Sequence, residues 1–259
     1  MRIMILNHTY MRPSDPGREG AVLELLSSYA SPGTTLVVDY PDDLGGGEAL
    51  RYFEQHKNLS GLHHILETPA LVKKIIEAER AGFDAVVQSN TFDPGVEAGR
   101  LAVRIPVVGP LRSSCHFAAC LCDRFAFIVP LESHVPYVWR TMETYRMDHF
   151  VTAIKAVNIY ESDMAKQHGL IVERAVAIGR EVVAQGAQAV IPLGGLLFPY
   201  EVKPEELERE VGIPVINTLA VAIRFAELMA SQKMIHSQKA YPWSPGLTPD
   251  HVSRRSGDR

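Results

Sequence analysis

Three small polar residues follow a short apolar run in the sequence AVVQSNTFDPG. The run Ala85–Gln88 has the pattern of a buried strand, and a helix is expected to begin near Pro94. The loop Ser89, Asn90 and Thr91 would then present backbone N–H groups at the N-terminus of a helix, where anions bind. With the carboxamide of Asn90 as a further donor, this loop could stabilise a carboxylate or an enolate. An ordinary polar strand-to-helix connection is the alternative.

A second strand pattern, Ala189–Pro192, is followed by Leu193 and then by Gly194 and Gly195. Two glycines allow a backbone to approach a ligand closely, and they equally allow a turn with positive φ. Both interpretations stay open on the sequence alone. In the first, the second strand end also offers amide donors and leaves room for a substrate.

Arg112, Ser113 and Ser114 are expected to open another helix. Serines at such a position are good N-caps, which is the structural interpretation. A guanidinium beside exposed helix N–H groups is also a site for a carboxylate or a phosphate. Asn217 and Thr218 end the last predicted strand and are further candidates for ligand contact.

The cysteines Cys115, Cys120 and Cys122 are an odd number and lie in one segment. This arrangement argues against a disulfide framework, and its spacing is not that of a zinc motif. We therefore expect buried cysteines on a helix and no metal site. Cys115 as a reactive thiol near a helix start is the alternative.

Short apolar stretches alternate with longer helical patterns along the chain, which predicts an α/β fold with parallel sheets flanked by helices. The predicted strands are Ile3–Leu6, Thr35–Asp39, Ala85–Gln88, Val107–Gly109, Phe125–Val129, Ile154–Val157, Ala189–Pro192 and Val215–Asn217. The predicted helices are Gly20–Tyr29, Pro69–Ala81, Gly95–Val103, Ser114–Cys122, Val135–Tyr145, Gly169–Gln185, Pro204–Val211 and Leu219–Met229.

The chain also contains an internal echo. AGFDAVV…RIPVVGP and QGAQAVI…GIPVINT share the order of a glycine, a buried strand, a loop, a helix and an Ile-Pro-Val strand. Two halves of similar design are implied, each with a small parallel sheet. Asn90 and Gly194 are then equivalent positions at the carboxyl ends of strands, where ligands bind in open parallel sheets.

Composition excludes several classes of protein. The chain has 259 residues, is 46% hydrophobic and carries a net charge of −4, with no basic cluster suited to nucleic acid. No window approaches the ~20 apolar residues of a membrane span. We expect a cytoplasmic protein that acts on a small molecule and binds neither nucleic acid nor membrane.

The segments GFDAVVQSNTFDPGVEAGR…IPVVGP, CDRFAFIVPLESHVP, GAQAVIPLGG and GIPVINTLAVAIRFAELM resemble the Asp/Glu/hydantoin racemase superfamily, most closely its hydantoin racemase branch. The resemblance implies two pseudo-symmetric α/β lobes with a pocket between them. We place these lobes at residues 1–105 with 218–235 and at residues 106–217, followed by a Pro-rich tail, 236–259, in which Tyr241 and Trp243 could pack. It also implies that no cofactor is needed and that the protein forms a homo-oligomer.

The chain departs from this superfamily at the residues that move protons. In the superfamily, two cysteines exchange the α-proton of the substrate, and these positions correspond here to Asn90 and Gly194. Neither residue can act as a base, so chemistry with two thiols is not expected. Arg112 stands where the superfamily has an acidic residue, which favours a substrate with an extra negative group.

The loop after the first predicted strand resembles the superfamily's carboxylate-binding loop. Asn7 and Thr9 fit that role, and His8 stands where proline is usual. Because histidine titrates near neutral pH, His8 is a candidate proton carrier; a surface histidine is the alternative.

Three functions remain open on these residues. The first is cofactor-independent isomerisation or epimerisation of a small carboxylate or cyclic amide, with the oxyanion held by Asn90 and its loop. The second is hydrolysis or decarboxylation of a small acid or cyclic amide, with a hydroxyl or water as the attacking group. The candidate catalytic residues are Asn90, His8 and Thr91. The third is a pseudoenzyme that binds a ligand without catalysis.

Overall fold

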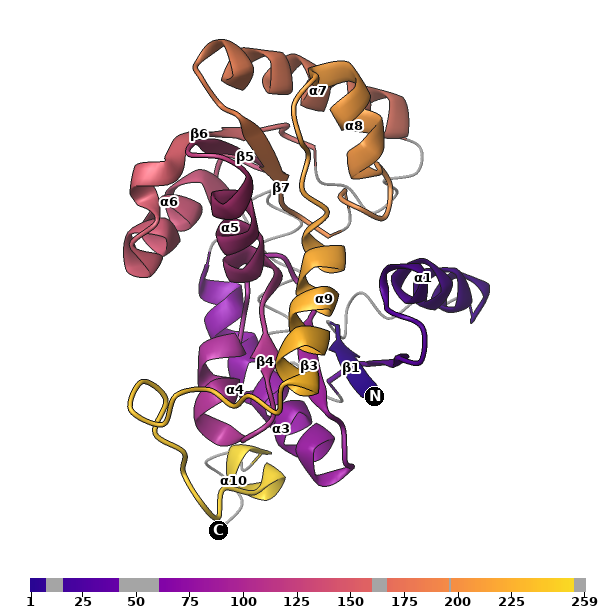
Figure 1. Cartoon of the computed structure of the whole chain (residues 1–259), viewed down its shortest axis with the longest axis vertical. Coiled ribbons are helices and arrows are strands. Elements are labelled where there is room, and N and C mark those ends of the chain that lie inside the picture. The colour runs from indigo at the N-terminus through magenta and orange to yellow at the C-terminus, as the bar shows by residue number, and fades with distance from the viewer. Residues whose placement is uncertain (8–15, 42–60, 160–166, 196, 254–259) are drawn as a thin grey trace. The chain divides into compact units, whose positions relative to one another are not determined.

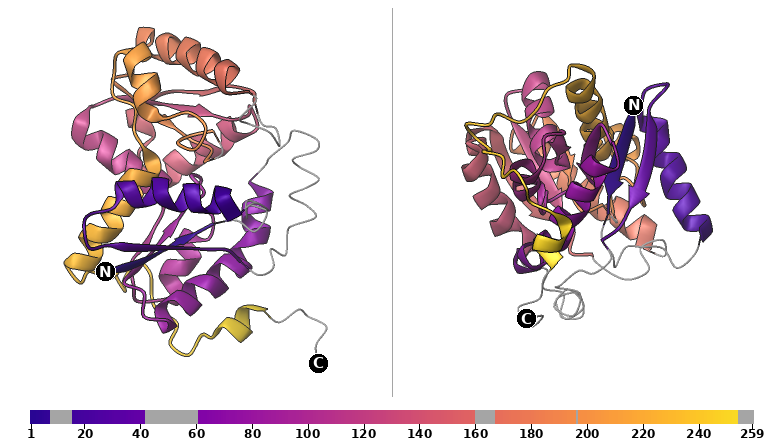
Figure 2. Two further views of the ribbon diagram at one scale, coloured as in Figure 1. Left: turned by 90° about the vertical axis from the view of Figure 1, so that its right-hand side faces the viewer. Right: turned by 90° about the horizontal axis from the view of Figure 1, so that it is seen from below.

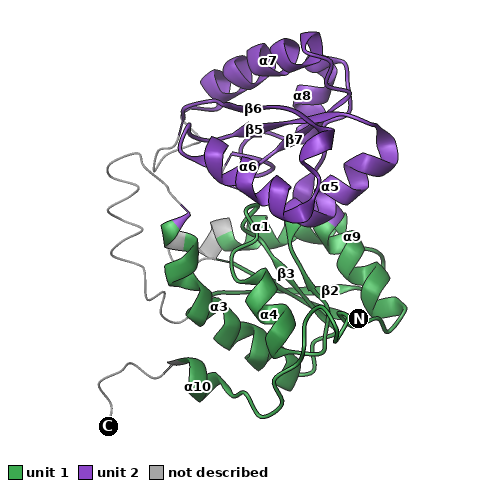
Figure 3. Cartoon of the chain, turned by 90° about the vertical axis from the view of Figure 1, so that its left-hand side faces the viewer, with its two compact units in different colours: residues 1–49, 62–110, 222–259 green, residues 50–61, 111–221 purple. Residues whose placement is uncertain are grey.

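The computed structural model of the chain describes residues 1–7, 16–41, 61–159, 167–195 and 197–253, of which 16–18 and 63 by their backbone alone. The chain divides into two compact units (Figure 3): unit 1 holds Met1–Ala49, Leu62–Pro110 and Ala222–Arg259, and unit 2 holds Leu50–Gly61 and Leu111–Val221. Within the described ranges, no helix combines the length and the apolar character that crossing a bilayer requires.

Unit 1 is built on a parallel four-stranded sheet (Figure 1). Its elements are β1 (Arg2–Leu6), α1 (Pro16–Tyr29), β2 (Thr35–Asp39), α3 (Leu62–Arg80), β3 (Ala85–Gln88), α4 (Val96–Ala102), β4 (Val107–Val108), most of α9 (Thr218–Ser231) and α10 (Pro249–Ser253). The strand order is β2-β1-β3-β4, and every residue of β3 is buried. This burial explains why the strand reads as a continuous apolar run rather than an alternating one.

Unit 2 repeats the same plan with three named strands. Its elements are α5 (Pro110–Leu121), β5 (Phe125–Val129), α6 (His134–Tyr145), the short 3-10 helix Asp148–Phe150, β6 (Val151–Ala156), α7 (His168–Ala184), β7 (Ala189–Pro192) and α8 (Pro204–Val211). The order β6-β5-β7, extended by one bridge from Val190 to Val215, matches β2-β1-β3-β4. Helices α7 and α8 lie side by side in this unit (Figure 1).

The internal echo in the sequence is confirmed at two helix ends. Gly82 after α3 and Gly186 after α7 both have positive φ, 74° and 94°. In each case the next N–H donates to a carbonyl five residues earlier, Phe83 to Ala78 and Ala187 to Val182. This is the Schellman ending, for which glycine is the favoured residue. The α/β fold with two halves of the same design is therefore confirmed.

The structure differs from several predicted elements, of which Val215–Asn217 and the helix expected at Pro69 are described first. In the stretch Val215–Asn217, only Val215 forms a bridge, to Val190, and the side chain of Asn217 already caps α9. Helix α3 begins at Leu62 and not at Pro69, which lies inside it. The carbonyl that Pro69 leaves without its helical hydrogen bond is that of Ile65, which is 69% exposed, so water can satisfy it.

The compact units also differ from the expected lobes at their boundaries. Residues 106–110 lie with unit 1 because β4 pairs with β3 in its sheet. The described part of the tail packs on the same unit, where α10 lies beside α3 (Figure 2). The indole Nε1 of Trp243 donates to the Ala102 carbonyl (3.2 Å), and Nε2 of His236 accepts the Val107 N–H (2.8 Å).

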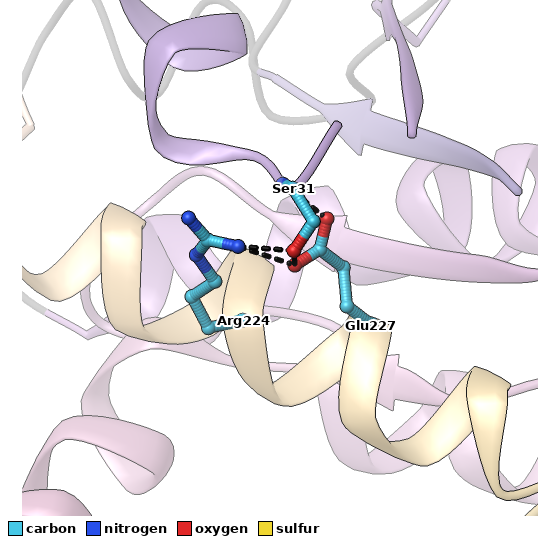
Figure 4. A network of polar contacts seen from close by, with 3 residues as sticks. All are labelled: Ser31, Arg224 and Glu227. Atoms are coloured by element: carbon cyan, nitrogen blue, oxygen red, sulfur yellow. Dashed lines mark hydrogen bonds and ion pairs between the residues drawn. The ribbon is translucent and has the colours of Figure 1, made fainter. Parts of the chain in front are cut away.

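A buried carboxylate holds the loop after α1 to helix α9 within unit 1 (Figure 4). Glu227 accepts hydrogen bonds from the Ser31 N–H and the Ser31 hydroxyl, both at 2.7 Å, and pairs with Arg224 at 3.2 Å. The guanidinium of Arg224 also donates to the Ser31 hydroxyl. Burial alone raises the pKa of Glu227, but hydrogen bonds from Thr34 and Ser31 and the charge of Arg224 outweigh it and lower the pKa.

Candidate functional site

The carboxyl end of the unit 1 sheet brings several predicted residues together. Leu6 of β1 pairs with Gln88 of β3, so the residues that follow these strands, Asn7 and Ser89, are neighbours. The Ser89 hydroxyl donates to Oδ1 of Asn7 (2.7 Å), and both residues are buried. Thr91 is fully buried two residues further on. His8 and Thr9 lie outside the described residues.

Two of the three loop N–H groups expected as anion donors already have partners, since the Ser89 N–H donates to the Leu6 carbonyl (2.9 Å). The Asn90 N–H donates to Oε1 of Gln88 (3.1 Å), and the Phe92 N–H donates to Oδ1 of Asn90 (3.0 Å). The Asp93 N–H donates to the Asn90 carbonyl (3.1 Å). Because the loop satisfies these donors itself, they do not form an open oxyanion hole. Helix α4 begins only at Val96 and has seven residues.

Two polar residues that sequence reasoning missed, His64 and Glu67, lie on the buried face of α3. Their side chains are 5% and 0% exposed. They continue the spacing of Leu71, Ile75 and Ala78, which are buried in the core of unit 1. Polar residues at helical spacing with an apolar stripe were the available signal. Since α3 packs against β1 and β3, its first turns bring His64 to the ends of these strands.

His64 meets the strand-end loop directly. Its Nε2 lies 3.4 Å from Nδ2 of Asn90, and its ring packs at a tilt against Phe92 with centroids 5.7 Å apart. These contacts join α3 to the loop after β3. We call the residues Asn7, His64, Ser89 and Asn90 the strand-end cluster of unit 1.

In unit 2, Gly194 occupies the place that Asn90 has in unit 1, two residues after the matching strand. Its φ is 94°, and its carbonyl accepts the N–H groups of Leu197 (2.8 Å) and Phe198 (2.9 Å). A Cβ at this position would lie 2.4 Å from Cγ of Pro130. Of the two interpretations of the glycine pair, the structure supports the turn. Gly195 is the next, half-buried residue of that turn.

Arg112, Ser113 and Ser114 do not open a helix, because α5 already begins at Pro110. Arg112 places its guanidinium 4.9 Å from the centroid of the Tyr145 ring. Ser113 and Ser114 are buried inside the helix, so their interpretation as N-caps is wrong. Pro110 at the first helical position starts the helix, as proline often does.

Asn217 has a structural role at the start of α9. Its Oδ1 accepts the Ala220 N–H (3.0 Å), which is the bond of an N-cap side chain. Thr218 is the first residue of α9 and is buried. This capping bond already uses the Asn217 side-chain oxygen that was expected to contact a ligand.

The cysteines lie on or just after α5, far in sequence from both strand ends. Cys115 is buried as expected, with its Sγ 3.7 Å from Sδ of Met142, but the expectation of a buried cysteine is wrong for Cys120, which is exposed. Burial raises the pKa of the Cys122 thiol, and the charge of Asp123 adds to this effect although a hydrogen bond with Arg124 opposes it. In the described part of the chain, no three His, Cys, Asp or Glu residues are grouped to hold a metal ion.

Comparison with known proteins places the fold. A family model described as Asp/Glu/Hydantoin racemase matches residues 63–226. Hydantoin racemase of Pseudomonas sp. (strain NS671) is 25% identical over 227 residues, which cover 88% of this chain and 85% of that protein. Hydantoin racemase of Rhizobium meliloti is 24% identical over 173 residues, 65% of this chain and 69% of that protein.

Solved structures of racemases have a fold similar to that of this chain. Allantoin racemase from Pseudomonas fluorescens has a TM-score of 0.80 at 18% identity, covering 96% of this chain and 99% of its own. Allantoin racemase from Klebsiella pneumoniae has a TM-score of 0.78 at 18% identity and covers 95% of both chains. Because the family model spans more than half of the sequence, the chain belongs to the Asp/Glu/hydantoin racemase family.

Proposed function

We propose that the protein is a cofactor-independent isomerase that moves a proton at the carbon next to a carbonyl of a small carboxylate or cyclic amide. Family membership supports an enzyme of the racemase type. The hydantoin racemase from Pseudomonas sp., which matches most of the chain, favours a cyclic amide as the substrate. The observation that carries the proposal is the strand-end cluster of unit 1, because polar side chains gather at the carboxyl end of a parallel sheet.

The proposed reaction does not use two thiols. By resemblance, the proton-transferring cysteines of the superfamily correspond to Asn90 and Gly194. The only cysteines of the chain are Cys115, Cys120 and Cys122. The burial of Cys115 and the raised pKa of Cys122 both disfavour a reactive thiolate. Proton transfer is therefore assigned to side chains other than cysteine.

The test is proton exchange at the substrate. The purified protein is incubated in D₂O with single enantiomers of 5-substituted hydantoins and of small carboxylates, and the α-proton is followed by NMR. We expect enzyme-dependent loss of the α-proton signal together with loss of optical rotation. A new hydrolysed or decarboxylated product would instead support the second function, and binding without exchange would support a pseudoenzyme. Either of these outcomes contradicts the proposal.

A further inference from the structure

We propose that Nε2 of His64 is the base that removes the α-proton, and that Asn90 is a positioning residue that holds this nitrogen in its unprotonated form. The inference rests on the proposed function and names the proton carrier for it. It assigns Asn90 a different role from the oxyanion donor expected from the sequence.

The neighbours of Asn90 determine the orientation of its carboxamide. A carboxamide has an oxygen that accepts and an NH₂ group that donates, and the neighbouring groups decide which is which. The Phe92 N–H can only donate, and it lies 3.0 Å from Oδ1 of Asn90. The oxygen must therefore face Phe92. It follows that the NH₂ group faces His64, with 3.4 Å between Nδ2 and Nε2.

The orientation of Asn90 in turn determines the tautomer of His64. A nitrogen that faces a donating NH₂ group keeps its lone pair, so Nε2 is unprotonated and the proton of the neutral ring is on Nδ1. A separation of 3.4 Å is at the long end for a hydrogen bond, so the amide orients the lone pair without binding it tightly. A substrate C–H that displaces this contact would meet a nitrogen ready to accept a proton.

Packing fixes the position of the His64 imidazole ring. His64 is 5% exposed and packs against Phe92, which is also buried. Asn90 is only half-buried and contacts both His64 and the Phe92 N–H. A base held on a helix is positioned more precisely than one on a loop. The ring is therefore oriented from one side by Asn90 and from another by Phe92.

Two acidic residues belong to the elements that surround the ring. Glu67 lies one turn further along the same buried face of α3, and residues three apart on a helix are neighbours. Asp93 is the acidic residue of the loop after β3, and its carboxyl group lies against Gly109.

The proposed step conserves protons and electrons. The lone pair of Nε2 takes the α-proton, and the electrons of the broken C–H bond form an enolate with the adjacent carbonyl. Water then donates a proton to the opposite face of the carbon, and the hydroxide formed takes the proton from the His64 imidazolium. The product is the other enantiomer, and the imidazole returns to its neutral form.

The first test replaces the base. In H64Q, which keeps a polar side chain of similar size, we expect α-proton exchange to fall at least ~100-fold, the usual range for loss of a general base. In H64A, added imidazole should restore part of the rate in proportion to its neutral form. The matched control is H236Q, because His236 belongs to the same unit but accepts a backbone N–H at the β4 edge. Circular dichroism checks that each variant is folded.

If the wild type exchanges the α-proton and H64Q does so at a similar rate, the inference fails while the proposed function stands. If the wild type itself shows no exchange, the proposed function fails. A folded H64A that loses exchange but is not rescued by imidazole also contradicts the role of His64 as the base. These outcomes separate the two proposals.

The second test concerns Asn90. In N90D the carboxylate accepts instead of donating, so it favours a proton on Nε2, and the acidic limb of the pH–rate profile should move to higher pH. In N90A the limb should move less, since no charge is added. If Asn90 is an oxyanion donor instead, both variants will lose rate equally with no movement of the limb. That result would overturn the assignment of Asn90 as a positioning residue.

Discussion

Replacing Gly194 by alanine is expected to lower the free energy of unfolding by about 3 kcal/mol, which is a large effect for one added methyl group. Two causes add up. A φ of 94° disfavours any residue with a Cβ, and the new Cβ would lie 2.4 Å from Cγ of Pro130. The turn must therefore shift, although its carbonyl is held by two N–H groups. Urea unfolding followed by circular dichroism measures the difference.

Gly212 provides a matched control for this prediction. Its φ is 79°, close to that of Gly194, but a Cβ there would meet no atom within 4 Å. G212A should therefore lose only the conformational part, about 1 kcal/mol. Equal losses in the two variants would show that Pro130 does not crowd position 194. The same crowding predicts that G194C destabilises the fold, so the thiol that the superfamily carries here cannot be introduced without a loss of stability.

Replacing Glu227 by alanine is the second large change, with an expected loss of about 3 kcal/mol at neutral pH, since hydrogen bonds to a buried charged group are among the strong ones. The variant leaves Arg224 and the Ser31 donors without their carboxylate. The matched control is E181A. Glu181 also pairs with a cation, Lys155, but its side chain is 49% exposed against 8% for Glu227. E181A should change the stability little.

The Glu227 network also predicts a dependence on pH. Because the pKa of Glu227 is lowered in the folded protein, its contribution is fully present above the unfolded value of about 4.3. The contribution is lost as the pH falls through the folded pKa. The stability difference between the wild type and E227Q should therefore shrink between pH 6 and the acid side of ~4. A difference that stays constant over this range would contradict the lowered pKa.

Much of the fold was predictable from the sequence because buried parallel strands leave a strong local signal. The strands Thr35–Asp39, Ala85–Gln88, Phe125–Val129 and Ala189–Pro192 have the predicted bounds. Each is a short run rich in apolar residues and flanked by polar residues or turn formers. Helix starts were less predictable, since Pro69 lies inside α3 and Ser113 inside α5. In α3, tertiary packing extends the helix beyond the local start signal, whereas in α5 Pro110 is itself an earlier start signal.

The candidate site was only partly predictable. Their position at strand ends identifies Asn7, Ser89 and Asn90 as candidates from the sequence, and the structure places them together. His64 was not predictable from the sequence, because its partner Asn90 is 26 residues away and the two side chains come together only when α3 packs on the sheet. The orientation of Asn90 depends on the Phe92 N–H, which no local pattern reveals.

The central claim is that this member of the racemase family moves a proton without sulfur. The most direct measurement is α-proton exchange in D₂O by the variant C115A/C120S/C122S, which removes every cysteine of the chain. The account predicts exchange within a few-fold of the wild type for the folded variant. Loss of exchange in a folded variant, with retention of activity in H64Q, would contradict the account and assign the reaction to a thiol.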